Sequence, residues 1–191
     1  MTMPLSNQIQ KILNVIPEGQ ARPFDFLQQR KSFKEEIRAV TTLDIPGLGE
    51  EKALLLKAAL YLYFDSFDEA HQIAQDHEGL EGNWIHAILH RREPDAGNSK
   101  YWYRRVAFPP EISKNINEKA LQLLEENPLS ELKGLQKRLA ASKAWEPEAF
   151  VDQVETFRAK DPVTPSYRLL AQIQEVEWRV LLRHLQTQGN D

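Results

Sequence analysis

Apolar residues recur every three or four positions along almost the whole chain, and no segment alternates strictly between apolar and polar residues. The first spacing is typical of amphipathic helices, whereas strict alternation is typical of half-buried strands. Near the C-terminus, for example, Leu169, Ile173, Val176 and Val180 form one helical stripe. The pattern therefore predicts an all-α protein.

Proline and glycine divide this pattern into separate helical segments, because both residues favour turns and helix ends. The expected helices cover about residues 9–16, 31–42, 50–63, 68–77, 83–92, 98–106, 111–126, 129–144, 147–160 and 165–186. A chain of 191 residues is long enough for one well-buried domain and short for two. We expect a single all-α domain over residues 1–191, with N-terminal helices and a loop in 1–49 and C-terminal helices in 107–191.

Residues 50–106 are expected to form two antiparallel helical hairpins, because short turns join their consecutive helices. Asp65 and Asp95 occupy matching turns 30 residues apart, close to the period of about 34 residues in tetratricopeptide repeats. Most of the small residues typical of that repeat are missing. The likeness supports stacked hairpins, with tetratricopeptide-like superhelical stacking as one option.

The composition narrows the class of protein. A net charge of −4 and a pI near 5.8 argue against binding to nucleic acids or anionic membranes, which favour basic surfaces. The absence of cysteine excludes disulfides, thiolate nucleophiles and cysteine-bound metals, and it fits a reducing compartment. There is neither a signal-like N-terminal pattern nor an apolar run of membrane-spanning length. We expect a cytoplasmic protein; its oligomeric state is not indicated.

Positive charge is concentrated in one segment, from Arg91 to Arg105. Two acids, Glu93 and Asp95, face five basic residues there, which makes the segment +3 and the rest of the chain −7. Crowded charges are costly unless a ligand, an ion or partner residues satisfy them. The basic residues are Arg91, Arg92, Lys100, Arg104 and Arg105. This segment is therefore the expected place of a functional site.

Three stretches resemble one known family: FDEAHQIAQ at 67–75, WIHAILHRREPDAGNSKYWYRRV at 84–106 and WEPEAFVDQVE at 145–155. Together they are similar to a family of uncharacterised bacterial and fungal proteins, whose central motif runs Trp-His-Ala-x-x-His-Arg-Arg-Glu and then Asn-x-Lys-Tyr-Trp. The likeness spans about residues 50–185. It implies a site around the motif and no particular reaction. One departure is Ile85, which separates a Trp from a His that the motif has adjacent.

Histidine spacing points to the same region. His86 and His90 lie one helical turn apart on one face, opposite an apolar side that includes Trp84 and Ile88, so they are expected to face solvent or to line a groove. The hairpin register places His71 near the level of residue 88. The same register predicts one layer across four helices that contains Tyr61, His71, His86, His90, Tyr101 and Arg104.

Two functions are compatible with this layer. In the first, the protein is a non-catalytic module that binds a small anionic ligand or an acidic partner segment, because arginine forks bind phosphate and carboxylate groups. The expected ligand-binding residues are His71, His86, His90, Arg91, Asp95, Lys100, Tyr101 and Arg104. The structural alternative is an internal network in which the arginines pair with Glu93 or Asp95 and Asn98 caps a helix. No catalytic residue is identified, since the chain has no phosphate-binding glycine loop, serine elbow or dinucleotide motif.

The second function is a divalent-metal-dependent enzyme, hydrolase-like in its chemistry. Its metal ligands would be His71, His86 and His90, with Asp95 or Glu93 as a possible carboxylate ligand and acid–base residue. Imidazole suits zinc, iron, nickel or copper, and three protein ligands leave one open position. The segment HAILH lacks the glutamate of the metalloprotease helix, and the nearby basic residues disfavour a dication. In the structural alternative, the histidines only hydrogen-bond neighbouring helices. We expect no cofactor under the first function and a transition metal under the second.

Overall fold

The computed structural model describes residues 7–13, 24, 33–45 and 47–187. In these ranges the chain forms ten α-helices and one 3₁₀ turn, and no strand. The all-α prediction is confirmed. The helices are α1 (Asn7–Leu13), α2 (Lys34–Thr41), α3 (Glu50–Tyr63), α4 (Phe67–Gln75), α5 (Leu80–Arg92), α6 (Ala96–Tyr103), α7 (Pro110–Glu126), α8 (Lys133–Ser142), α9 (Pro147–Phe157) and α10 (Pro165–Gln186).

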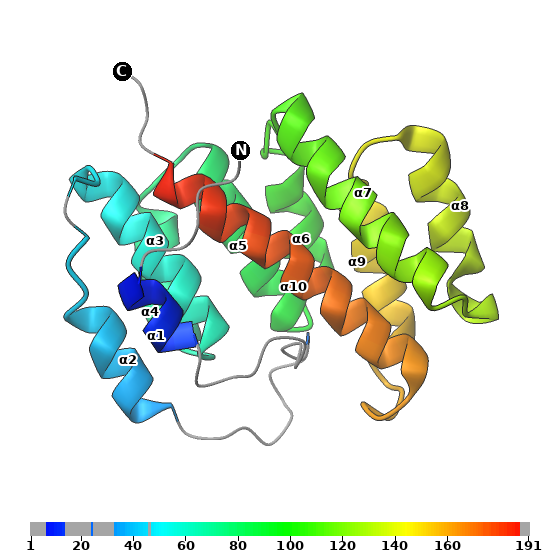
Figure 1. The fold of residues 1–191 in the computed structure, drawn as a ribbon, viewed down its shortest axis with the longest axis horizontal. Coiled ribbons are helices and arrows are strands. Elements are labelled where there is room, and N and C mark those ends of the chain that lie inside the picture. The colour runs from blue at the N-terminus through cyan, green and yellow to red at the C-terminus, as the bar shows by residue number, and fades with distance from the viewer. Residues whose placement is uncertain (1–6, 14–23, 25–32, 46, 188–191) are drawn as a thin grey trace.

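Consecutive helices from α3 to α6 pack against one another as hairpins, as the sequence predicts. The long helix α10 then crosses the molecule diagonally and contacts α3, α5, α7 and α9 (Figure 1). Helices α1 and α2 lie at one end of the molecule, and α8 and α9 lie at the other. Tetratricopeptide-like stacking stays a prediction for α3 to α6. Helix α10 connects these hairpins to α7 and α9.

A single hydrophobic core runs from Ile9 on α1 to Leu185 on α10. Helix α5 lies at its centre, because α3, α4, α6 and α10 all pack around it. Its apolar side is buried as expected, but His86 and the two arginines at its C-terminal end are buried as well. The expectation of a solvent-facing side or open groove along α5 is therefore wrong for His86, since α4 and α6 cover it.

The start of α5 differs from the sequence pattern, which places it at residue 83. The helix begins at Leu80, after Gly79 at a φ of 142°, a conformation that favours glycine. A Cβ atom on Gly82 would lie 1.8 Å from the carbonyl oxygen of His77. Glycine at 82 thus allows the first turn of α5 to approach the end of the preceding segment.

Two other boundaries also depend on local contacts. Helix α6 begins at Ala96 because Asp95, and not Asn98, is its N-cap: the Asp95 carboxylate accepts the backbone N–H of Asn98 at 3.0 Å. The helix expected at 129–144 divides into a 3₁₀ turn, Ser130–Leu132, and α8. The expected end of the first helix at residue 16 lies outside the described residues.

Helix α10 is the longest described helix, at 22 residues, and it carries charged side chains along its length. Among the described residues, no helix has both the length and the apolar character needed to span a membrane.

Candidate metal centre

Three histidine side chains from two helices converge at the interface of α4 and α5. His71 lies on α4, and His86 and His90 lie on α5. Each offers one ring nitrogen, and the three nitrogens lie within 4.8 Å of one another. The rings of His86 and His90 are parallel to within 3°, and the ring of His71 stands edge-on to both. Of the described residues, these three are the only His, Asp or Glu side chains that form a group with metal-ligand spacing.

We call His71, His86 and His90 the triad. Its geometry follows from the two helices that carry these residues. The spacing of four residues places His86 and His90 on one face of α5, and the short connection from α4 brings His71 opposite them. Nitrogens bound to zinc at about 2.0–2.1 Å in a tetrahedron are about 3.3 Å apart. The nitrogens of the triad, up to 4.8 Å apart, would therefore have to approach one another by up to about 1.5 Å to hold such an ion, which requires rotation of the side chains.

Burial favours the neutral form of two of the three imidazoles, those of His86 and His90. His86 is 1% exposed, and its Nδ1 has no hydrogen-bond partner among the described residues. Burial, and then the nearby His71 and His90, lower the pKa of His86 to about 4. Burial also lowers the pKa of His90, with a further contribution from His71 that Asp95 opposes. Neutral imidazole is the form that binds metals, so His86 and His90 are in the metal-binding form at neutral pH.

Trp102, on α6, packs against the triad. Its ring stacks on His86, with the centroids 4.2 Å apart and the planes within 9°. The ring of Tyr101 meets Trp102 edge-on, and the guanidinium of Arg105 lies 3.5 Å from the Tyr101 centroid. The layer predicted from the sequence includes Tyr101 and omits Trp102. The hairpin register placed Trp102 level with residue 88, beside the histidines, and so could have identified it.

The two acidic residues after α5 have separate roles. Glu93 Oε2 lies 3.3 Å from Nδ1 of His90. Burial raises the pKa of Glu93, Asp68 and Asp95 raise it further, and His71 lowers it. The pKa of Asp95 is lowered, chiefly by the hydrogen bond from the Asn98 backbone. Neither carboxylate belongs to the group of three nitrogens, so the triad leaves a coordination position open.

Four of the five basic residues pair with acids outside the segment, and not with Glu93 or Asp95, whereas Arg105 donates to the carbonyl oxygen of Tyr101. On α6, Lys100 binds Asp152, and Arg104 contacts Glu148 at 2.9 Å, both acids being on α9. At the end of α5, Arg92 binds Asp65 and the carbonyl oxygen of Leu62. The internal network expected as an alternative, with Glu93 or Asp95 as partners and Asn98 as a cap, is therefore wrong in its partners: Arg91, Arg92 and Arg104 pair with other acids, and Asp95 is the N-cap. These pairs neutralise much of the charge that the sequence shows between residues 91 and 105.

Arg91 points away from the triad into a buried polar cluster, the Glu177 network, formed by Glu177, Arg91, Tyr103, Trp84 and Trp145. Arg91 Nη1 lies 2.7 Å from Glu177 Oε2, and Glu177 Oε1 accepts hydrogen bonds from both indoles at 3.1 Å and from the Tyr103 hydroxyl at 2.8 Å. Burial alone would lower the pKa of Arg91, but Glu177 and Tyr103 raise it above its usual value. Burial raises the pKa of Tyr103.

The predicted layer is thus only partly assembled. The three histidines meet, whereas the Tyr61 hydroxyl contacts Thr41 Oγ1 at 3.0 Å and Tyr101 is exposed. Arg91 and Arg104 serve other contacts. The hairpin register predicts only how far along the helix axes a residue lies. It does not fix the direction in which the side chain points.

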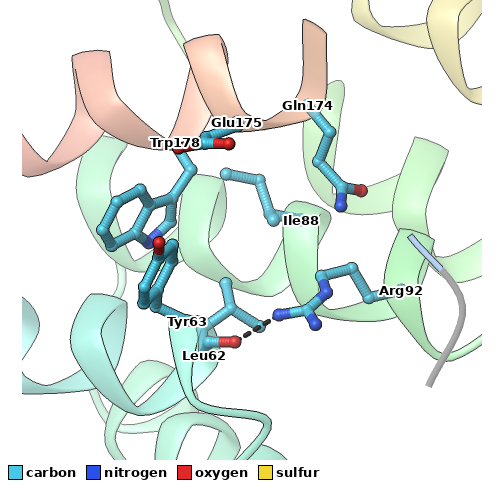
Figure 2. A pocket seen from close by; sticks show the side chains of 7 residues that line it. All are labelled: Leu62, Tyr63, Ile88, Arg92, Gln174, Glu175 and Trp178. Carbon is cyan, nitrogen blue, oxygen red and sulfur yellow. Dashed lines mark hydrogen bonds between the residues drawn. The ribbon is translucent and has the colours of Figure 1, made fainter. Parts of the chain in front are cut away.

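A second feature is a small cavity between α3, α5 and α10 (Figure 2). Its walls are mostly apolar, and Tyr63 stacks on Trp178 with the centroids 4.3 Å apart. The Arg92 guanidinium at its rim donates to the carbonyl oxygen of Leu62, and Glu175 pairs with Arg179 at 2.7 Å. The charged groups of this cavity are thus already paired, so it offers less chemistry than the triad.

Comparison with protein-family models, curated proteins and solved structures found no match to this chain. The family resemblance of residues 67–155 therefore stays a prediction. The functional argument depends on the geometry of the site.

Proposed function

We propose that the protein binds a divalent transition metal through His71, His86 and His90, and that it is a metal-dependent enzyme of hydrolase-like chemistry. The convergence of three ring nitrogens within 4.8 Å carries the proposal. The buried Nδ1 of His86 supports it, because an unpaired buried polar atom costs about 1–3 kcal/mol unless a partner satisfies it.

Zinc is the ion that fits the residues best. Three imidazole ligands and one open position would make a tetrahedral site of the catalytic type, and zinc has no geometric preference that opposes it. Such an ion lowers the pKa of a bound water to about 7, which supplies a nucleophile at neutral pH. Glu93 is the nearby carboxylate with an oxygen close to the site, and Asp95 is engaged by Asn98.

The anion-binding function stays a prediction without a supporting contact. Three of its expected residues, Arg91, Lys100 and Arg104, already have acidic partners. An anionic ligand or an acidic partner segment would have to displace them. The cytoplasmic location and the absence of nucleic-acid and membrane partners also stay predictions.

Elemental analysis tests the metal function directly. Protein purified without a histidine tag or chelator is expected to contain close to one transition-metal ion per chain, and His86→Ala and His90→Ala are expected to lose it. His77→Ala is the matched control, because His77 lies outside the triad and contacts the Ile73 carbonyl oxygen. Zinc at 100 times its dissociation constant should stabilise metal-free wild type by about 2.7 kcal/mol. Metal-free protein that gains no thermal stability from zinc, nickel, manganese or iron would overturn the proposal.

A further inference from the structure

The carboxylate of Glu93 lies against one side of the His90 ring. Glu93 is the C-cap of α5, held by its backbone N–H to the Leu89 carbonyl oxygen at 2.9 Å. Its Oε2 lies 3.3 Å from Nδ1 of His90, three residues before it. A carboxylate oxygen thus lies beside Nδ1 of His90, on one side of the ring.

A histidine can bind a metal only through an unprotonated nitrogen, and its other nitrogen then carries the proton. Proteins commonly fix this choice with a carboxylate that accepts the second N–H, which orients the ring and raises the basicity of the ligand atom. In the described part of the chain, no carboxylate makes a corresponding contact with either ring nitrogen of His86, and His86 Nδ1 has no hydrogen-bond partner. Of the two histidines of the triad on α5, His90 alone has a carboxylate oxygen beside its ring.

We propose that Glu93 is a positioning residue for the metal centre: it holds His90 in the Nδ1–H tautomer and directs Nε2 to the ion. This role rests on the proposed metal function. It also accounts for the place of Glu93 beside the triad and outside the group of ligand nitrogens.

Asp95 provides a matched control, because its carboxylate lies near enough to His90 to raise the pKa of the ring but makes no ion pair with it. Its two oxygens accept the backbone N–H and the side-chain amide of Asn98, at 3.0 and 2.8 Å. Asp95→Asn removes the charge and keeps a good N-cap for α6. Comparing the zinc affinity of variants at Glu93 and Asp95 distinguishes a direct contact with His90 from a general effect of negative charge.

The experiment measures zinc affinity by competition with a chromophoric chelator in wild type and three variants. Glu93→Ala is expected to lose about 10–100-fold in affinity. Glu93→Gln should lose less, because its amide oxygen can still accept the Nδ1–H of His90. Asp95→Asn should change the affinity by less than about threefold, since it leaves the contact between Glu93 and His90 in place.

Nitrogen-15 NMR of the histidine rings gives a readout that loss of packing alone would not produce. In zinc-bound wild type, His90 is expected to have a protonated Nδ1 and a metal-bound Nε2, and Glu93→Ala should lose this fixed tautomer. If wild type binds zinc and Glu93→Ala keeps both affinity and tautomer, the positioning role is overturned alone. It is also overturned if Asp95→Asn weakens binding as much as Glu93→Ala. Wild type that binds no zinc overturns the metal function, and the positioning role with it.

Discussion

His86 is the residue in which the structure and the proposed chemistry are most closely linked. It is buried, its ring stacks on Trp102, and its pKa is about 4 because burial and two neighbouring histidines disfavour its charged form. In an unfolded chain the same side chain titrates near 6.5. The folded and unfolded states therefore bind protons differently over a defined range of pH.

This difference predicts how the metal-free protein responds to acid. Above about pH 6.5 neither state protonates His86, and its full contribution to stability is present. As the pH falls from 6.5 to about 4, the unfolded state takes up a proton that the folded state excludes, so the free energy of unfolding decreases. The loss from this residue is about 3 kcal/mol when complete. Urea unfolding of chelator-treated wild type at pH 7, 5.5 and 4.5 measures it.

His86→Phe is the comparison variant, because it keeps an aromatic ring against Trp102 and cannot titrate. Its unfolding free energy should change much less than that of wild type between pH 7 and 4.5. Equal slopes in the two proteins would show that His86 is not the source of the pH dependence.

At the same scale, the sequence could predict the triad but not the partners of the basic residues. The spacing of His86 and His90 and the register of the hairpins are local properties, so they place three histidines together. Arg91 meets Glu177, which lies 86 residues further along the chain. No short-range pattern shows which distant acid will lie beside an arginine once the helices pack.

At the scale of elements, most helices could be predicted because proline and apolar spacing mark them clearly. The start of α5 could not, since it depends on a tertiary approach: the carbonyl oxygen of His77 occupies the space where a side chain on residue 82 would lie. Whether a glycine allows such an approach or merely ends a helix is not visible in the apolar pattern.

At two helical glycines we expect substitution by alanine to have opposite effects on stability. Gly82→Ala would place a Cβ 1.8 Å from a backbone oxygen, so α5 must shift, at a cost of about 1–3 kcal/mol in stability. Gly134→Ala, near the start of α8, meets no atom within 4 Å. It should stabilise the protein by about 0.4–1 kcal/mol, because alanine favours the helix and restricts the unfolded chain. Thermal unfolding of both variants checks the pair, and a stabilising Gly82→Ala would contradict the close approach.

At the scale of the whole molecule, the Glu177 network joins α5 and α6 to α10 and to the segment before α9. Its central pair, Arg91 and Glu177, is fully buried. Breaking such a pair by removing one partner leaves an uncompensated charge in the core and costs about 3–5 kcal/mol. The network therefore fixes how these elements pack more than it adds net stability.

A double-mutant cycle tests this view. Arg91→Met and Glu177→Gln should each destabilise the protein by about 3–5 kcal/mol, and the double variant should lose clearly less than the sum, because no buried charge remains unpaired. The exposed pair Arg104 and Glu148, 59% and 44% exposed, is the control. Its coupling should stay below about 1 kcal/mol. Additive losses at Arg91 and Glu177, measured by urea unfolding, would contradict a coupled buried pair.

The central position of α5 has a consequence for changes in chain length. Trp84 and Arg91 reach the Glu177 network from one side of this helix, while His86 and His90 reach the triad from the opposite side. One residue inserted between them would rotate everything after it by about 100° and advance it by about 1.5 Å. Neither cluster could then be restored without losing the other. We therefore expect single-residue insertions within residues 84–91 to prevent stable folding, and insertions in the turns on either side of α5 to be tolerated.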